Sequence, residues 1–507
     1  MSTSGPLDPR LARQGRFLLA AAAALSTAGL LAYSQTHAFG WDEGYHLLAA
    51  QLIRAGKAPY LNFCFPQTPV AAYWNAGWMS LFGEHWRVVH AASALCAAAA
   101  TLLAAGFVLR RMPDSSWRTA GAISTAVLII ANTTVVQFAT TGQPYGLCLL
   151  LIVAAFICAT AAVHRTAPLL AAAAGAFAGA AAASSLLTAS VVPVLLVWMI
   201  LCNQAGGRLA KAGWFAAGVL VSWAPVIWLF VQGPRQVFFN VVEYMLLYRR
   251  AEWPGATRHD LEVVFSLFES PQGLALGFLG AAGFFWGARR PNALRWRHEL
   301  RLCFCLVTAL AVHVSLARPT FPQYYLFTVP FLAIAACAGL YGLSSRLGGR
   351  PLWTVIAVAA VICGGLAKRL YDEARNDFFW RDMEAVARQV EAVTPRSASL
   401  LASEEHIYFL TRRPPPPGME VEDSHGIPAP PADAALLHLV SRDQLRKQME
   451  AGMFDTVEVC EEDPDRVHEL GLEQIYARHA VILPCYIYWE RAGSAKGRAA
   501  NGPALHR

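Results

Sequence analysis

The sequence has little charge for its length. Of its 507 residues, only 15% are Asp, Glu, Lys or Arg, whereas 56% are hydrophobic. A soluble globule of this size needs more polar surface than these residues supply, which excludes a water-soluble chain. Apolar runs of about twenty residues recur from residue 17 to about residue 370, and each can cross a hydrocarbon core of about 30 Å. The chain therefore needs a membrane.

Cysteine is scarce outside the apolar runs. Eight of the 11 cysteines lie within the runs, where we expect them to pack as small hydrophobic residues: Cys96, Cys148, Cys158, Cys202, Cys303, Cys305, Cys337 and Cys363. Only Cys64, Cys460 and Cys485 lie elsewhere. A disulfide framework is not indicated, although Cys460 could pair with Cys485 if their side of the membrane is oxidising.

The apolar runs predict eleven membrane spans in a transmembrane domain of residues 1–370. The spans cover residues 17–35, 86–109, 118–136, 143–163, 167–183, 186–202, 211–231, 271–288, 300–317, 323–345 and 352–370. The first run has no clear small-x-small cleavage site before Trp41 and has a long apolar core, so we keep it as a span. Residues 167–202 are expected to form two spans with a tight hairpin around residues 183–185. A single span there would invert everything after it.

Positive charge occurs in alternate loops. Six consecutive positions on one side carry it: Arg10, Arg13 and Arg16; Arg110, Arg111 and Arg118; Arg165; Arg208 and Lys211; Arg289, Arg290, Arg295, Arg297 and Arg301; Arg346 and Arg350. The positive-inside rule makes that side, with the N-terminus, cytoplasmic. The net charge of +7 therefore reflects topology, and we expect no nucleic-acid partner. Residues 36–85, residues 232–270 and the C-terminal part then face outward, where long loops usually carry the site.

Long apolar runs are missing after about residue 370, so we expect residues 371–492 to form a small soluble α/β domain. Apolar residues at helical spacing predict a helix over residues 378–393, and Ser441 with Gln444 forms a capping box before another helix. Short apolar runs lie at residues 399–402, 434–440, 455–460 and 480–488, and prolines around residues 414–417 and 428–431 predict rigid loops. Residues 493–507 are expected to be a disordered tail.

The first outer loop combines an acidic pair with a helix pattern. It reads Gly-Trp-Asp-Glu-Gly-Tyr-His over residues 40–46 and Gly-Lys-Ala-Pro-Tyr over residues 56–60, followed by two prolines and Tyr73-Trp74. Between these motifs, four apolar residues share one helical face: Leu47, Leu48, Leu52 and Ile53. Gly56 suits the helix end. We expect a helix that lies flat on the membrane surface.

These motifs resemble the type C membrane glycosyltransferases. An acidic pair after the first span, a Gly-x-x-Pro-Tyr turn, and prolines with an aromatic before the second span are typical of one subgroup. It contains protein O-mannosyltransferases, lipid A aminoarabinose transferases and related bacterial enzymes, and is glycosyltransferase family 39-like. Residues 321–325, Phe-Pro-Gln-Tyr-Tyr, with the later Pro330, are similar to the family's His-Tyr-Phe and later proline. Residues 380–414 are similar to the family's outer domain.

The resemblance implies a reaction. Members of this family move a sugar from a polyprenyl-phosphate carrier to an acceptor at the outer face of the membrane. Nucleotide sugars are made in the cytoplasm, so an outer-face transferase needs a lipid-linked donor. Here the sugar would be a hexose or a pentose, and the acceptor a lipid, a glycan or a protein. By resemblance, Asp42 is the general base of an inverting transfer, a role that contributes about 10²- to 10⁴-fold in rate.

Other residues are candidates for binding. Glu43 could support Asp42, and Asp42, Glu43 and His46 could hold a divalent cation, although no cofactor is certain. The leaving phosphate needs cations, for which the candidates are Lys57, Arg249, Arg250 and Arg318. His46 and Tyr60 are further candidates for substrate binding, and Gln323 and Tyr324 are expected to line the substrate cavity.

Each of these residues also has an ordinary structural interpretation. Asp42 could cap the surface helix, with Glu43 interacting favourably with the helix dipole. His46 could be a structural residue. The Arg249-Arg250 pair could contact lipid headgroups, and Lys57 could be an ordinary solvated charge.

The sequence departs from the family's pattern in two places. Several relatives carry an acidic residue before the fourth span, where residues 140–145 of this chain read Thr-Thr-Gly-Gln-Pro-Tyr. No carboxylate is present, which weakens a metal-dependent mechanism and makes Gln143 a candidate neutral substitute. Many relatives place Thr-Lys after the fifth span, where residues 184–188 read Ser-Ser-Leu-Leu-Thr. The missing lysine would change contacts to the donor phosphate.

Two other classes of protein are alternatives for a chain with many spans. A transporter or flippase for a lipid-linked or small polar solute should carry ionisable residues near the middle of its spans. This chain has few there, His313 being the clearest, and has its acidic pair in an outer loop. An inactive scaffold would be expected to lose the acidic pair.

The Ala- and Arg-rich composition is compatible with a bacterial inner membrane. For the C-terminal domain, which has no nucleophile, metal or phosphate motif, we expect acceptor positioning or structural cover.

Overall fold

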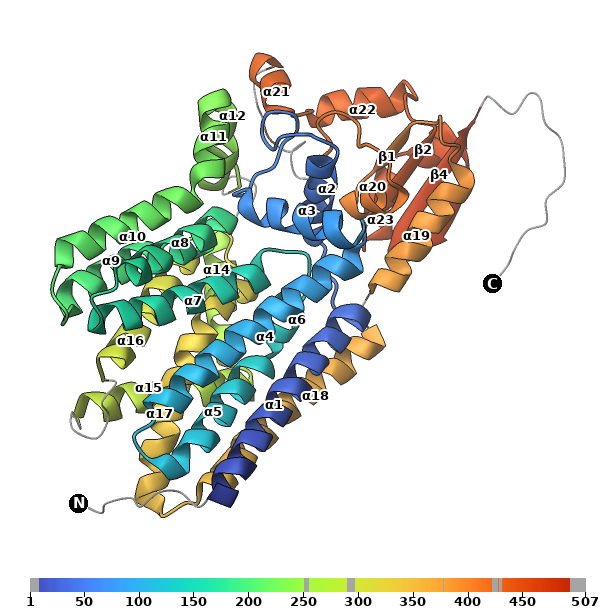
Figure 1. Ribbon diagram of the computed structural model, residues 1–507. Coiled ribbons are helices and arrows are strands. Elements are labelled where there is room, and N and C mark those ends of the chain that lie inside the picture. Colours follow the sequence, from blue (N-terminus) through green and yellow to red (C-terminus); the bar gives the residue numbers. More distant parts are fainter. Residues whose placement is uncertain are drawn as a thin grey trace. The chain divides into compact units, whose positions relative to one another are not determined.

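The computed structural model describes residues 9–249, 255–289, 297–376, 378–421, 427 and 431–492. The chain divides into two compact units (Figure 1). Unit 1 contains residues 1–40 and 66–377, and unit 2 contains residues 41–65 and 378–507. The acidic segment, which the sequence pattern groups with the spans, therefore folds with the C-terminal part of the chain. Arg250 and the expected tail at residues 493–507 lie outside the described residues.

Unit 1 is helical, and each of the eleven expected spans overlaps a helix. Its elements are α1 (Pro9–Thr36), α3 (Val70–Phe82), α4 (Trp86–Arg111), α5 (Ser115–Ile130), α6 (Thr133–Phe138), α7 (Tyr145–His164), α8 (Pro168–Ser184), η1 (Leu186–Thr188), α9 (Val191–Cys202), α10 (Arg208–Ser222), α11 (Ala224–Gln232), α12 (Pro234–Phe238), the π-helix η2 (Phe239–Tyr248), α14 (Ala256–Ser266), α15 (Pro271–Arg289), α16 (Arg297–Ser315), η3 (Pro322–Thr328), α17 (Val329–Leu347) and α18 (Pro351–Asn376).

Six of the described helices are long and apolar enough to cross a membrane, or up to eight if each of two bent pairs is one span. The bent pairs are α10 with α11, at 55°, and α14 with α15, at 76°. Two further apolar segments, which contain α8 and α9, are shorter. These helices support a multi-pass integral membrane protein. Eleven spans and their sidedness stay predictions.

Residues 167–202 form two helices, as expected. Helix α8 ends at Ser184, and α9 begins at Val191 after the short turn η1. The backbone N–H of Gln204, just after α9, donates to the carbonyl of Val163 at the end of α7, at 3.1 Å. Helix α8 begins only a few residues after the end of α7. The end of α9 therefore lies near the start of α8, and the two helices form a hairpin.

Close approach at glycines fixes two helix pairs of unit 1. A Cβ atom at Gly283 of α15 would lie 1.9 Å from the Ala335 carbonyl oxygen, and one at Gly339 of α17 would lie 2.2 Å from that of Leu279. Helices α8 and α10 meet in the same way at Gly175 and Gly218. Within a bilayer, where apolar burial does not drive association, such small residues allow the backbone contacts that hold helices together.

Unit 2 contains a four-stranded sheet covered by short helices. Its elements are α2 (Glu43–Arg54), α19 (Trp380–Val393), β1 (Leu400–Ala402), α20 (Glu405–Thr411), α21 (Pro431–Leu437), α22 (Arg442–Glu450), β2 (Thr456–Cys460), α23 (Pro464–Glu469), α24 (Leu472–Ile475), β3 (Tyr476–Ile482) and β4 (Cys485–Arg491). The strand order is β1-β2-β4-β3; β1 and β2 are parallel, and the other pairs are antiparallel. This confirms the expected α/β character.

Two local predictions for unit 2 are confirmed. Helix α19 covers residues 380–393 and buries the apolar side that its spacing predicts, with Met383, Val386 and Val390 fully buried. The Ser441 hydroxyl accepts the N–H of Gln444, and the Gln444 side chain accepts the N–H of Ser441. Both residues therefore satisfy backbone groups that the start of α22 would otherwise leave unpaired.

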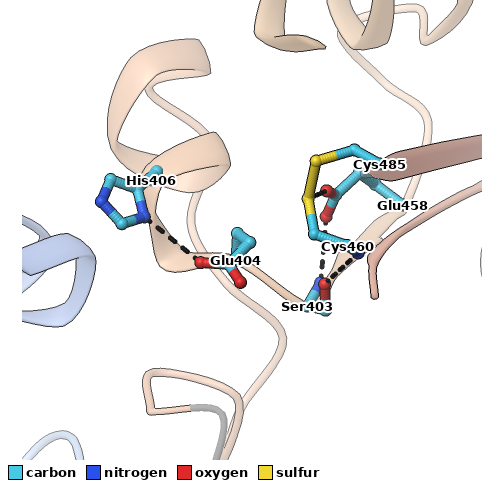
Figure 2. The surroundings of a disulfide bond; sticks show 6 residues. All are labelled: Ser403, Glu404, His406, Glu458, Cys460 and Cys485. Atoms are coloured by element: carbon cyan, nitrogen blue, oxygen red, sulfur yellow. Dashed lines mark hydrogen bonds and ion pairs between the residues drawn. A yellow bond between two sulfur atoms is a disulfide. The ribbon is translucent and has the colours of Figure 1, made fainter. Parts of the chain in front are cut away.

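The cysteine pairing that the sequence left open is present in unit 2. Cys460 and Cys485 are directly opposite each other on β2 and β4 and form a disulfide (Figure 2). The fully buried Glu458 lies beside this bond, and one of its oxygens accepts the N–H of Ser403 at 3.1 Å. The Ser403 hydroxyl in turn accepts the N–H of Cys460 at 2.9 Å. The disulfide is thus tied to the turn that leads from β1 into α20.

Candidate active site

Helix α2 carries the acidic segment, and its sequence explains where it ends. Gly56 has a φ of +84°, which a residue without a side chain adopts at little cost. Its N–H donates to the Ile53 carbonyl, and the N–H of Lys57 donates to the Leu52 carbonyl. These two bonds close the last turn and satisfy carbonyls that the helix leaves unpaired. The expected helix of the first loop is therefore present.

Asp42 occupies the N-cap position of α2 but does not cap it. Its backbone is helical, with φ −67° and ψ −10°, and its side chain makes no capping hydrogen bond. A capping carboxylate needs an extended backbone to reach the amides of the first turn. Asp42 is exposed at the start of the helix. The capping interpretation of Asp42 is therefore wrong.

Glu43 differs sharply from its neighbour, because it is fully buried. Its Oε1 accepts a hydrogen bond of 2.7 Å from the indole Nε1 of Trp380. As a first-turn acid it also lies at the positive end of the α2 dipole. Two adjacent carboxylates therefore have separate environments, one open to solvent and one held inside unit 2.

His46 is buried on the same helix, and its ring contacts those of Tyr45 and Phe65. Burial lowers the pKa of His46 to about 3, and the nearby Glu43 offsets part of this shift. The imidazole is therefore neutral at physiological pH. Within the described residues its Nδ1 has no hydrogen-bond partner.

A metal site at the acidic segment finds no support in the geometry. Among the described residues, three metal-ligating atoms converge within 4.8 Å only at Glu458, Cys460 and Cys485. The two sulfurs of that group are bonded to each other. Asp42, Glu43 and His46 do not form such a group.

The two remaining first-loop candidates lie in contrasting places. Lys57 is exposed just beyond α2. Tyr60 is fully buried, adopts a φ of +69°, and packs its ring against Phe65. Tyr60 therefore contributes to the core of unit 2 and shapes the turn after the helix.

In unit 1, the structure brings two of the predicted substrate-binding residues together. Arg249 follows the π-helix η2, and its Nη2 donates to the hydroxyl of Tyr324 on η3 at 2.6 Å, across 75 residues of sequence. The guanidinium also lies 5.8 Å from the ring centre of Phe321 and 5.9 Å from that of Tyr324. Gln323, next to Tyr324, is half-buried. This Arg249 group is a cation held by aromatic side chains.

Arg318 lies close to an acidic residue, Asp260, and no sequence pattern indicates this contact. Its Nε lies 3.8 Å from Asp260 of α14, and its Nη1 lies 3.4 Å from the Thr257 hydroxyl. Asp260 also accepts the N–H of Thr320 at 2.8 Å, and the His259 ring approaches the Thr320 carbonyl at 3.0 Å. Helix α14 thus holds the loop before η3, and the charge of Arg318 is partly neutralised.

Gln143 lies in a polar, buried stretch of unit 1. Its side chain is 5% exposed, and within the described residues its Oε1 has no hydrogen-bond partner. The neighbouring Gly142 carbonyl accepts a 2.8 Å bond from Asn75, another buried side chain. An unsatisfied buried oxygen costs about 1–3 kcal/mol, which favours a ligand or water at this position.

Sequence reasoning missed Trp380, Asp260 and Asn75. Trp380 was noted only as the first residue of the segment that resembles the family's outer domain, and its indole N–H is the only polar group of its side chain. Asp260 and Asn75 lie in segments that match no motif. A buried indole needs an acceptor, which is the only signal in the sequence that pointed beyond packing.

The sequence matches no protein-family model and no curated protein. Solved structures do match. The lipid A aminoarabinose transferase ArnT from Cupriavidus metallidurans, bound to undecaprenyl phosphate, has a TM-score of 0.66 and 17% identity, covering 95% of this chain and 99% of that chain. Its apo state gives a TM-score of 0.65, with 17% identity over 94% and 98% of the two chains.

A more distant match is the Archaeoglobus fulgidus oligosaccharyltransferase in complex with Zn and sulfate. Its TM-score is 0.54 at 14% identity, and the match covers 87% of this chain and 68% of that chain. At these identities the matches establish the fold alone. The chain has the fold of the type C membrane glycosyltransferases, which agrees with the family resemblance of the first outer loop.

Proposed function

We propose that the protein is a membrane glycosyltransferase that moves a sugar from a polyprenyl-phosphate-linked donor to a lipid, glycan or protein acceptor. The observation that carries this proposal is the acidic segment. An exposed carboxylate that caps nothing, Asp42, precedes a fully buried one, Glu43, on a rigid helix in a chain with the type C fold. An exposed acid at the start of a helix is open to a substrate that approaches from solvent.

The proposed reaction is an inverting displacement. A hydroxyl or amine of the acceptor attacks the anomeric carbon as the bond between that carbon and the phosphate oxygen breaks. Asp42 takes the proton of the attacking group, and the polyprenyl phosphate leaves with the bonding electron pair. Glu43 supports Asp42 from inside unit 2. A positioned base of this kind contributes about 10²- to 10⁴-fold in rate.

The Arg249 group is the proposed binding site for the donor phosphate. Phosphate is recognised well by guanidinium, whose N–H groups match two of its oxygens. The Tyr324 hydroxyl fixes the direction of the Arg249 side chain, and the two aromatic rings restrict its motion. Lys57 remains a second candidate, since it is exposed. Arg318 is the weaker candidate because it faces Asp260.

A divalent cation is not part of the proposed mechanism. The neutral Gln143 stands where several relatives have a carboxylate, and Asp42, Glu43 and His46 do not converge on one point. Gln143 instead offers its buried amide oxygen to a hydroxyl or N–H of the substrate. Its proposed role is therefore recognition.

The proposed site of action is the outer face of a bacterial inner membrane. The loop charges favour this side for unit 2, and the disulfide between Cys460 and Cys485 supports it, because disulfides persist in oxidising compartments. The donor's lipid tail would stay in the bilayer while its sugar meets the acidic segment.

A panel of donors tests this proposal. The purified protein in detergent is offered polyprenyl phosphates that carry different hexoses and pentoses, with the corresponding nucleotide sugars as controls. We expect one or more lipid-linked donors to bind and to release polyprenyl phosphate when acceptor lipid, glycan or peptide is added. Binding of none of the lipid-linked donors, or transfer from a nucleotide sugar alone, would overturn the proposal.

A further inference from the structure

We propose that the segment of residues 378–380, at the start of α19, is a clamp that positions the acidic pair, with Trp380 as its positioning residue. This inference rests on the proposed function and deepens it. Trp380 acts through Glu43, and Phe378 acts through Trp41. The C-terminal domain would then be part of the catalytic device rather than a cover for it.

The first contact of the clamp is the bond from Trp380 to Glu43. Both side chains are buried, and the donor and acceptor atoms are 2.7 Å apart although the residues are 337 positions apart in sequence. Trp380 has one hydrogen-bond donor, and Glu43 receives it. Hydrogen bonds to a charged group are stronger than neutral ones and fix the geometry of the acceptor.

The second contact lies on the other side of Asp42. The rings of Trp41 and Phe378 stack with their centres 5.3 Å apart and an angle of 16° between their planes. Trp41 is 39% exposed, so general burial does not fix its ring, and the stacking on Phe378 is a specific contact. Residues 41 and 43 are therefore both held by residues 378–380, and Asp42 lies between them in the chain.

The third contact explains Gly44. A Cβ atom at this position would lie 2.6 Å from Nδ1 of His406 and 3.0 Å from its backbone nitrogen. Only glycine allows α20 to approach α2 this closely. Further along α2, Gln51 donates to the carbonyl of Phe409 at 3.2 Å. The helix that begins at the acidic pair is therefore fixed along its length by α20.

Fixing the residues on both sides of Asp42 limits where its carboxylate can point. Adjacent Cα atoms are about 3.8 Å apart, so little freedom remains once Trp41 and Glu43 are held. Misplacing a catalytic group by about 1 Å lowers rates by about 100-fold. Loss of one of three contacts should therefore lower the rate moderately and leave the fold intact.

A double-mutant cycle of Trp380→Phe and Glu43→Leu tests the clamp. Phenylalanine keeps an aromatic ring but is smaller and has no N–H donor, and leucine removes the acceptor. We expect Trp380→Phe to lower kcat by about 10-fold, to leave KM for the donor within twofold, and to cause little further loss when Glu43 is already Leu. Trp380→His, which can also donate a hydrogen bond, should recover part of the rate.

Two controls separate positioning from a folding defect. Val390 is buried on the same helix and takes part in none of the three contacts described above. Val390→Ala should lower stability while kcat stays near that of the wild type. The number of donor molecules bound per chain gives the folded fraction of each variant. A loss of kcat for Trp380→Phe that follows this fraction, or the same loss in the Glu43→Leu background, would overturn the clamp.

The cycle also distinguishes failure of the clamp from failure of the proposed function. If wild-type protein transfers sugar and Asp42→Asn does not, the function stands. A Trp380→Phe variant with wild-type kcat would then refute the clamp alone. If Asp42→Asn is as fast as wild type, the proposed function itself is wrong.

Discussion

The two units hold their buried carboxylates in different ways. In unit 1, Glu299 lies 3.2 Å from the guanidinium of Arg111, and Glu373 lies 3.0 Å from that of Arg369. In unit 2, the hydrogen bonds described for three buried acids come from neutral N–H groups, whereas a fourth, Glu404, lies 3.3 Å from the His406 ring. These hydrogen bonds join Trp380 to Glu43, the Gly418 backbone to Glu420, and the Ser403 backbone to Glu458.

This difference separates structural acids from acids suited to chemistry. Removing either partner of a buried pair of a carboxylate and a guanidinium leaves an uncompensated charge that destabilises the protein. In unit 1, Glu299 joins α16 to α4 through Arg111, and Arg369 and Glu373 pair within α18. In unit 2, Glu420 can respond to pH, because burial raises its pKa to about 7.

The largest expected difference is between the effects of Glu43→Gln and Glu299→Gln on kcat and melting temperature. Glu43→Gln should lower kcat by about 100-fold with little change in melting temperature, since the amide still accepts the Trp380 bond and only the charge is lost. Glu299→Gln should do the reverse, because Arg111 loses its acid while the acidic segment is untouched. Steady-state transfer and thermal unfolding, measured on both variants, check this pair. Equal losses of activity would contradict the comparison.

The disulfide of unit 2 provides the next test. Breaking the bond between Cys460 and Cys485, with a sequence separation of 25, should lower the stability of unit 2 by about 3 kcal/mol through the entropy of the unfolded chain. Because Ser403 links β2 to α20, amide hydrogen exchange should rise in α20 and then in α2. Exchange in α4 and α7 of unit 1 serves as the internal control, and faster exchange there would count against a local effect.

The sequence predicted the local features of the acidic segment but not what holds it. Gly56 and the spacing of Leu47, Leu48, Leu52 and Ile53 mark a helix within a few residues, so α2 was predictable. Trp380 and Glu43 carry no sign of each other, because their contact depends on the tertiary fold. The same holds for the pairing of Arg249 with Tyr324, of which only the residue types were predictable.

The burial of individual residues in the first loop was not predictable from the sequence. Tyr60, a predicted substrate-binding residue, is fully buried and packs against Phe65. Its role in substrate binding stays a prediction. Conversely, Asp42 was a plausible helix cap, and the helical backbone at that position prevents capping. Both outcomes depend on backbone angles that a single sequence does not specify.

A smaller effect on stability is expected from Glu420, the buried carboxylate that accepts the Gly418 N–H. Burial raises the pKa of Glu420 from 4.5 to about 7 in the folded chain, so the folded state disfavours its charged form. The stability of unit 2 should therefore fall by about 3 kcal/mol in total as the pH rises from about 4.5 to 7, and it should change little above that range. Glu420→Gln should remove this dependence. Melting temperatures across pH 4 to 8 for both proteins provide the check.

The smallest expected effect is on KM for the donor, and it concerns Arg249, which contacts the neutral aromatic side chains of Phe321 and Tyr324. Arg249→Lys should raise KM for the donor by about tenfold, since lysine cannot match phosphate with two parallel N–H groups or stack on Phe321 and Tyr324. Tyr324→Phe, which keeps the ring and loses the hydroxyl, should raise it less. Arg258→Lys, on an exposed ion pair with Glu262, is the matched control. Donor titrations in which the control and Arg249→Lys behave alike would exclude the proposed phosphate contact.

The most direct test of the whole account is a single-turnover measurement with Asp42→Asn. The variant is loaded with the donor identified for the wild type, mixed with acceptor, and followed by release of polyprenyl phosphate. Asparagine has nearly the same shape but cannot take the acceptor's proton. The account predicts wild-type donor binding with a rate of transfer lower by about 1,000-fold. Transfer by Asp42→Asn at the wild-type rate would contradict it.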